Sequence, residues 1–176
     1  HWAAMTVTGP SARKLLAVIH ADMGEHARAI SLLEHVLRVQ PDDAQAQSSL
    51  GRVYLAQGRY GKAIELLEKA AQAGDPRALS SLGFSRLGQG DTAAAAKTLT
   101  AAFDKAPTDL ELAIMLANTL MREGNPSQAL EVARRAAVAA PGNPAALNLL
   151  GAIQGAQGDL DGARGAYDEA LKLEAG

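Results

Sequence analysis

Residues 50–70 read LGRVYLAQGRYGKAIELLEKA, and this stretch decides the fold of the chain. Apolar residues recur at helical spacing on both sides of Gly58, which indicates two short amphipathic helices. Gly58 separates them, because glycine can adopt the left-handed conformation that a tight turn between helices requires. Small residues at Gly51 and Ala63 mark the point where the two helices are expected to cross closely. The stretch therefore predicts a helix-turn-helix unit without strands.

The same unit returns five times along the 176-residue chain. The copies are placed at 10–43, 44–75, 76–109, 110–143 and 144–176, after an N-terminal extension at 1–9. Two positions are small in every copy, the eighth and the twentieth: Ala17, Gly51, Gly83, Ala117 and Gly151, then Ala29, Ala63, Ala95, Ala129 and Ala163. A period of about 34 residues predicts an all-α stack in which each helix pair contacts only its neighbours.

Turn and capping residues fall where this division needs them. One glycine stands at the turn inside each copy: Gly24, Gly58, Gly90, Gly124 and Gly158. Asp43 and Asp109 are predicted to cap the first helices of the second and fourth copies. Three dipeptides are expected to pair a capping side chain with a proline in the first helical turn: Asp75-Pro76, Asn125-Pro126 and Asn143-Pro144. His20 and His26 occupy positions where large side chains usually pack, so we expect them to fill the core.

Composition and motifs give no support to catalysis or to a cofactor. The chain has no cysteine, and no serine lies in a recognisable nucleophile motif. The segment from Gly58 to Lys62 looks like the end of a phosphate loop, but it lies at a helix-helix turn and not after a strand. His20, His26 and His35 are not spaced to place two ligands on one helical face, so no metal site is expected. We therefore expect a non-enzymatic protein without a cofactor.

The repeated residues resemble the tetratricopeptide repeat, whose pattern runs Trp-x-x-Leu-Gly-x-x-Tyr and then Ala, Phe and Pro. No copy has the Trp, and only one has the Tyr, at Tyr54. More narrowly, phrases such as GRVYLAQGRYGKAIELLEKA resemble the tetratricopeptide lipoproteins of bacterial PEP-CTERM (exosortase) systems. The resemblance implies a right-handed superhelical solenoid of five repeats. It also implies a link to exopolysaccharide production in the bacterial envelope.

In this family the first helix of each repeat lines a concave groove through positions 2, 5, 9, 12 and 13. Carried onto this chain, the resemblance implies these ligand-binding residues: Lys14, Gln45, Ser48, Arg52, Arg77, Ser80, Phe84, Asn118, Arg122 and Asn148. Four further residues occupy the same kind of position: Asp22, Glu111, Ile114 and Met121. The groove is thus largely polar, and Phe84 is its best anchor candidate because aromatic residues dominate interface hot spots. Phe84 has an equal alternative role, as extra packing between neighbouring helices.

One known groove chemistry can be tested residue by residue. In some members of this family a carboxylate clamp of Lys and Asn from one repeat, Asn from the next, and Lys and Arg from a third binds the C-terminus of a chaperone. The matching positions of this chain hold Lys14, Val18, Ser49, Arg77 and Ser81. Lys14 and Arg77 are basic as the clamp requires, but both asparagines are missing. We therefore do not expect a chaperone-tail adaptor.

Two kinds of partner remain open. The first is a protein or peptide held along the groove, because five repeats offer the area of a standard interface. The alternative is an exopolysaccharide that follows the polar groove, although sugar sites usually offer stacking aromatics and only 3% of the residues are aromatic. A net charge of −2 with no basic stripe argues against nucleic acid.

The two ends of the sequence and its cysteine count bear on the length of the parent protein and on its cellular location. No apolar run is long enough for a membrane span. The sequence begins at His1 without Met and no polar capping helix follows the last repeat, so we expect a fragment of a longer array. Tyr167, Ala170 and Leu171 are expected to lie on an outer face where another helix would stack, which allows end-to-end self-association. The zero cysteine count leaves a periplasmic, outer-membrane-associated site and a cytoplasmic one both open; the narrower resemblance favours the periplasm.

Overall fold

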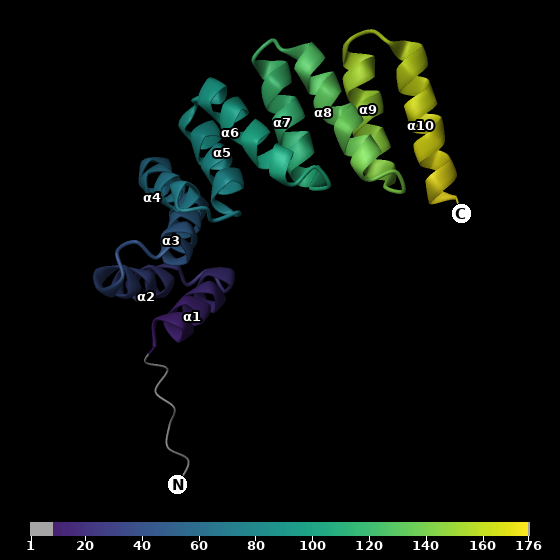
Figure 1. Cartoon of the computed structure of the whole chain (residues 1–176). Helices are drawn as coiled ribbons and strands as arrows, with labels where there is room; N and C mark the ends of the chain where they lie inside the picture. The colour runs from purple at the N-terminus through teal and green to yellow at the C-terminus, as the bar shows by residue number, and fades with distance from the viewer. Residues whose placement is uncertain (1–8, 176) are drawn as a thin grey trace. The chain divides into compact units, whose positions relative to one another are not determined.

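A computed structural model describes residues 9–175, and every regular element in that range is an α-helix (Figure 1). The helices are α1 (Pro10–Asp22), α2 (His26–Val39), α3 (Ala44–Ala56), α4 (Tyr60–Gln72), α5 (Ala78–Gln89), α6 (Thr92–Lys105), α7 (Leu110–Arg122), α8 (Pro126–Ala139), α9 (Pro144–Ala156) and α10 (Leu160–Glu174). The prediction of an all-α repeat fold is confirmed. The N-terminal extension predicted at 1–9 lies almost entirely outside the described residues. Two compact units divide the chain between Asp91 and Thr92.

The first unit contains α1 to α5 and has one apolar core. Each helix packs against the next, and α3 also contacts both α1 and α5. Leu33 of α2 and Leu67 of α4 are almost completely buried, and Leu50 and Tyr54 of α3 belong to the same apolar core. Burial of such side chains is worth about 1.5–3 kcal/mol each, so this shared layer is the main source of the unit's stability.

The second unit contains α6 to α10 and follows the same plan. Helix α7 packs against α6, α8 and α9, and α9 packs against α8 and α10. Phe103, Leu99 and Leu116 are fully buried in it. The guanidinium of Arg135 lies 4.9 Å from the centre of the Phe103 ring and forms an ion pair with Asp104 at 2.8 Å. The guanidinium of Arg135 therefore covers the ring of Phe103 and ties α8 to α6 through Asp104.

The small residues at the eighth position have the role that the sequence predicts wherever their surroundings are described. A Cβ added to Gly51 would stand 2.6 Å from Cγ of Leu67 and 3.3 Å from the carbonyl oxygen of Ala63. A Cβ added to Gly151 would stand 3.0 Å from the ring of Tyr167. A larger side chain would force the two helices of each pair apart.

The turn glycines adopt the predicted left-handed backbone, with φ between 69° at Gly58 and 91° at Gly90. Gly74 shares this conformation, with φ of 88°, and the sequence reasoning missed it. Gly74 lies two residues after the end of α4, the place that Pro41, Pro107 and Pro141 occupy after α2, α6 and α8. The chain therefore leaves α4 by a glycine turn there.

Of the five side chains predicted to cap helices, three are confirmed as caps and two are not. Asp43 and Asp109 accept hydrogen bonds from the first turns of α3 and α7, and Asn143 does so for α9. The prediction for Asp75-Pro76 is wrong, because α5 begins only at Ala78 and Asp75 instead accepts the backbone N–H of Arg77 in the preceding turn. Asn125 makes no side-chain cap, although proline does occupy the first turn of α8.

Two further expectations need correction. Ala170 is only 2% exposed, because it faces back into the second unit, while Leu171 is 62% exposed as expected. His20 is only partly buried and its Nδ1 lies 2.5 Å from a carboxylate oxygen of Glu25, so its role is a hydrogen-bond contact at the end of α1. Between residues 9 and 175, no helix combines the length and the apolar character that crossing a bilayer requires.

Candidate functional site

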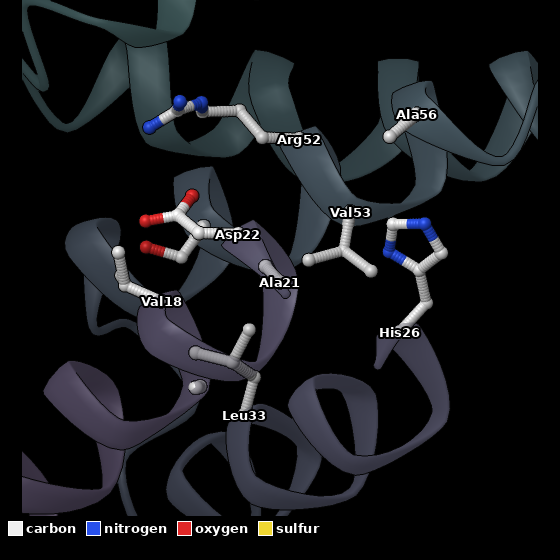
Figure 2. Close-up of a pocket in the computed structure, with 10 residues that line it drawn as sticks. Val18, Ala21, Asp22, His26, Leu33, Arg52, Val53 and Ala56 are labelled. Atoms are coloured by element: carbon white, nitrogen blue, oxygen red, sulfur yellow. The ribbon is translucent and has the colours of Figure 1, made fainter. Parts of the chain in front are cut away.

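A pocket of about 160 Å³ opens between α1, α2 and α3 (Figure 2). It lies entirely within the first unit. Its walls are mainly small and aliphatic, with charged groups among them: Ala17, Val18, Ala21, Asp22, His26, Leu33, Ser49, Arg52, Val53 and Ala56. An engineered cavity of about 150 Å³ holds one benzene molecule, so this pocket has room for one side chain and not for a large ligand.

Local sequence explains why the pocket is there. Val18 and Asp22 are four residues apart, so they lie on one face of α1. Asp22 is the last residue of α1, and the left-handed turn at Gly24 then brings the chain round so that His26 starts α2. On the opposite wall, Ala56 ends α3 with a side chain too short to fill the space.

The pocket carries two opposite charges that the protein itself does not neutralise. Asp22 and Arg52 are both exposed, and among residues 9–175 neither forms a hydrogen bond or an ion pair. In Figure 2 they lie on the same side of the pocket, across from His26. An unpaired carboxylate can accept from an N–H or ammonium group, and an unpaired guanidinium can bind a carbonyl or carboxylate. The site can therefore offer both kinds of polar contact beside an apolar surface.

His26 adds a third polar group to the pocket wall. Its Nδ1 is buried and has no hydrogen-bond partner among the described residues. Figure 2 shows the imidazole beside Val53 and Ala56, at the far side from the charges. The expectation that His26 fills the core is met only in part, because the ring is half-buried and one of its faces borders the pocket.

Lys14 forms an ion pair within the chain. Its Nζ lies 2.7 Å from the carboxylate of Asp43, and both side chains are about 15% exposed or less. Burial by itself would raise the pKa of Asp43, but the hydrogen bonds from Lys14 and from the N–H of Ala46 outweigh it and hold that pKa below its usual value. Lys14 therefore fastens α1 to the start of α3, and it is not a free ligand-binding cation.

The other predicted groove residues divide by exposure. Ser48 is 3% exposed, because it is small and α3 is flanked by both α1 and α5, so the expectation that it faces a ligand is wrong. Gln45, Arg52 and Arg77 are exposed in the first unit, where Ser80 and Phe84 are half-buried. Asn118, Arg122 and Asn148 are exposed on α7 and α9 of the second unit. Of these predicted residues, the pocket includes only Arg52.

The sequence reasoning missed the pocket itself. The groove pattern includes both Asp22 and Arg52, but it does not predict that they border one small apolar hollow. The available signal was the pair of alanines at groove positions, Ala21 and Ala56, where larger residues would have closed the gap. No group of three or more metal-ligating side chains comes together in the described part of the chain.

Comparison with known proteins identifies the repeats. Models of the tetratricopeptide repeat family match residues 14–78, 86–153 and 144–169. Together these segments cover most of the chain and include all the helices of the pocket.

Solved structures share the fold. The crystal structure of MamA superposes with a TM-score of 0.79 at 21% identity, covering 94% of this chain and 92% of that one. YrrB, described as a tetratricopeptide repeat protein with an unusual peptide-binding site, gives a TM-score of 0.72 at 21% identity, covering 95% and 87%. At this level of identity the likeness concerns the fold.

Two mouse proteins contain related segments. Protein O-mannosyl-transferase TMTC1 is 27% identical over 169 residues, which is 93% of this chain but 15% of the transferase. Superkiller complex protein 3 is 36% identical over 53 residues, 30% of this chain and 3% of the mouse protein. The chain thus spans a small part of the length of either relative.

Proposed function

Because the chain belongs to the tetratricopeptide repeat family, we propose that it is a non-catalytic scaffold that binds a peptide or helix of a partner protein. Binding would take place along the first helices of its repeats, which are α1, α3 and α5 in the first unit. The fold similarity to YrrB, a protein described as having a peptide-binding site, supports this kind of ligand.

One observation carries the proposal. The pocket between α1 and α3 combines an apolar wall with the unpaired charges of Asp22 and Arg52. Exposed charges beside an apolar hollow are poorly explained by stability, because neither contributes an ion pair to the fold. They are well suited to a peptide, which offers N–H and C=O groups at every residue and an apolar side chain at some of them.

The setting that we propose is the bacterial envelope, in an assembly connected with exopolysaccharide. The basis is the resemblance of the repeat phrases to tetratricopeptide lipoproteins of PEP-CTERM systems. The same resemblance is the basis for placing the protein in the periplasm, and fractionation of the source organism, with the cytoplasm as the contrary outcome, tests that location.

Affinity capture from envelope and cytosolic extracts of the source organism, followed by mass spectrometry, tests the proposal. The baits are the parent protein, a double variant Asp22→Ala/Arg52→Ala, and a control variant Arg134→Ala that removes an exposed charge of α8. Envelope proteins retained by the parent and the control, but lost by the double variant, would support the proposal. Equal capture by all three baits would move the binding surface elsewhere, and capture of polysaccharide without protein would favour a glycan ligand.

A further inference from the structure

The pocket between α1 and α3 defines a chemical class of peptide, and this inference rests on the proposed function. We infer that the pocket binds one aliphatic side chain of an extended peptide segment that carries one acidic and one basic residue close to this anchor. The inference follows from the size of the pocket, the nature of its walls and the signs of its two charges.

Size and wall chemistry define the anchor. A volume of about 160 Å³ is well below the 300–1,000 Å³ of pockets that enclose whole small-molecule ligands. One side chain of the size of leucine or methionine fits this space. Val18, Val53 and Leu33 line it with methyl groups, so an apolar anchor gains by leaving water.

Charge defines the flanking residues. Arg52 on α3 and Asp22 at the end of α1 are of opposite sign, and each is without a protein partner in the described structure. A segment with two acidic flanks would place one of them against Asp22, and a segment with two basic flanks would place one against Arg52. A segment with one flank of each sign avoids both repulsions. It satisfies both charges when its acidic flank lies against Arg52 and its basic flank against Asp22.

The test uses three synthetic peptides with the same central leucine: Ac-Glu-Gly-Leu-Gly-Lys-NH₂ and its counterparts with two Glu or two Lys flanks. Binding is followed on the whole protein through NMR shifts of the Val18 and Val53 methyl groups, which also report where the peptide binds. The mixed peptide should bind about two- to fivefold more tightly than either of the others, the ratio expected for an exposed ion pair. Exchanging leucine for alanine in the mixed peptide should weaken binding by about tenfold or more, since three methylene equivalents are no longer buried.

Charge variants of the protein make the test decisive. Asp22→Lys should shift the preference to the peptide with two Glu flanks, and Arg52→Glu to the peptide with two Lys flanks. Lys69→Glu, an exposed charge of α4 away from the pocket, is the matched control and should leave the preference unchanged. Ala56→Leu should weaken binding of the mixed peptide by filling the pocket at an exposed position. Circular dichroism confirms that each variant is folded.

The outcomes separate this inference from the proposed function. If the Val18 and Val53 methyl groups respond but the three peptides bind equally, or the preference ignores the charge variants, the inferred class is wrong although peptide binding stands. If these methyl groups do not respond to any of the peptides, the inference is overturned, and the capture experiment decides separately whether a protein is bound elsewhere.

Discussion

Replacing Gly51 by alanine is expected to destabilise the protein, although the same exchange usually stabilises a helix. Gly51 lies in the middle of α3, where alanine is favoured over glycine by about 1 kcal/mol of helix propensity. The new Cβ, however, would stand 2.6 Å from Cγ of Leu67, which is fully buried, and 3.3 Å from the backbone oxygen of Ala63. Overpacking of this kind costs about 1–3 kcal/mol. The net destabilisation should therefore be about 0–2 kcal/mol.

Gly165 offers a matched control inside α10. A Cβ added there would meet no atom within 4 Å, so only the propensity term acts. Gly165→Ala should stabilise by about 0.5–1 kcal/mol. Urea unfolding followed by circular dichroism measures both changes as shifts of the transition midpoint. Because a repeat array need not unfold in one step, coincident transitions from circular dichroism and fluorescence should be checked first.

A double variant identifies the cause. In the presence of Leu67→Ala the clash partner is gone, so adding Gly51→Ala should become neutral or stabilising. The coupling free energy between the two sites should be about 1 kcal/mol or more in the direction of rescue. If Gly51→Ala stabilises the parent as much as Gly165→Ala does, the close crossing of α3 and α4 is not rigid and the reasoning is wrong.

Three other predictions concern stability and titration. Leu116→Ala should destabilise by about 2–5 kcal/mol in urea unfolding, because Leu116 is completely buried; an unchanged midpoint would contradict the described core. Asp43→Ala should lower the free energy of unfolding by about 0.5–2 kcal/mol for the lost cap, with a further loss for the missing contact with Lys14. Asp43→Asn keeps the cap, so it should lower the free energy of unfolding by less. Because the pKa of Asp43 is lowered in the fold, the stability contributed by its carboxylate is present above the unfolded pKa of about 3.9 and is lost as the pH falls through the folded pKa. The difference in free energy of unfolding between the parent and Asp43→Asn should therefore disappear in acid. A difference that stays constant with pH would refute the assignment. Burial and the nearby carboxylate of Glu34 raise the pKa of Tyr54, so the stability that its neutral phenol contributes is fully present below the unfolded pKa of about 10 and is lost as the pH rises through the folded pKa. In absorbance titrations Tyr54→Phe should remove the component that ionises last.

The helices and their turns were predictable because their causes are local. A glycine with positive φ, an aspartate that caps three residues onward, and a small residue at a helix crossing each act within one helix pair. The same reasoning failed at Asp75-Pro76, where the second copy is two residues shorter and Gly74 makes the turn instead. A shorter copy changes the path of the chain, and nothing in the family pattern specifies that path.

The candidate site was predictable only in part, because it depends on contacts between copies. The groove pattern predicts that Lys14 binds a ligand, but Lys14 reaches Asp43, 29 residues away, and no pattern within one copy reveals that contact. Ser48 was assigned to the groove, but the flanking helices cover it. The pocket arises from space that neighbouring helices leave unfilled, and unfilled space has no sequence signature of its own.

The Asp43 carboxylate has a consequence for how the end of the array unfolds. In a linear array, stability divides into a term intrinsic to each helix pair and a term for each interface between neighbours. Asp43 contributes to both, since it caps its own helix and holds the cation of the preceding pair. Loss of the first helix pair therefore removes the cation that favours the charged cap of the second pair. We expect the two pairs to fray together, so hydrogen exchange should show α1 to α4 opening as one cooperative unit.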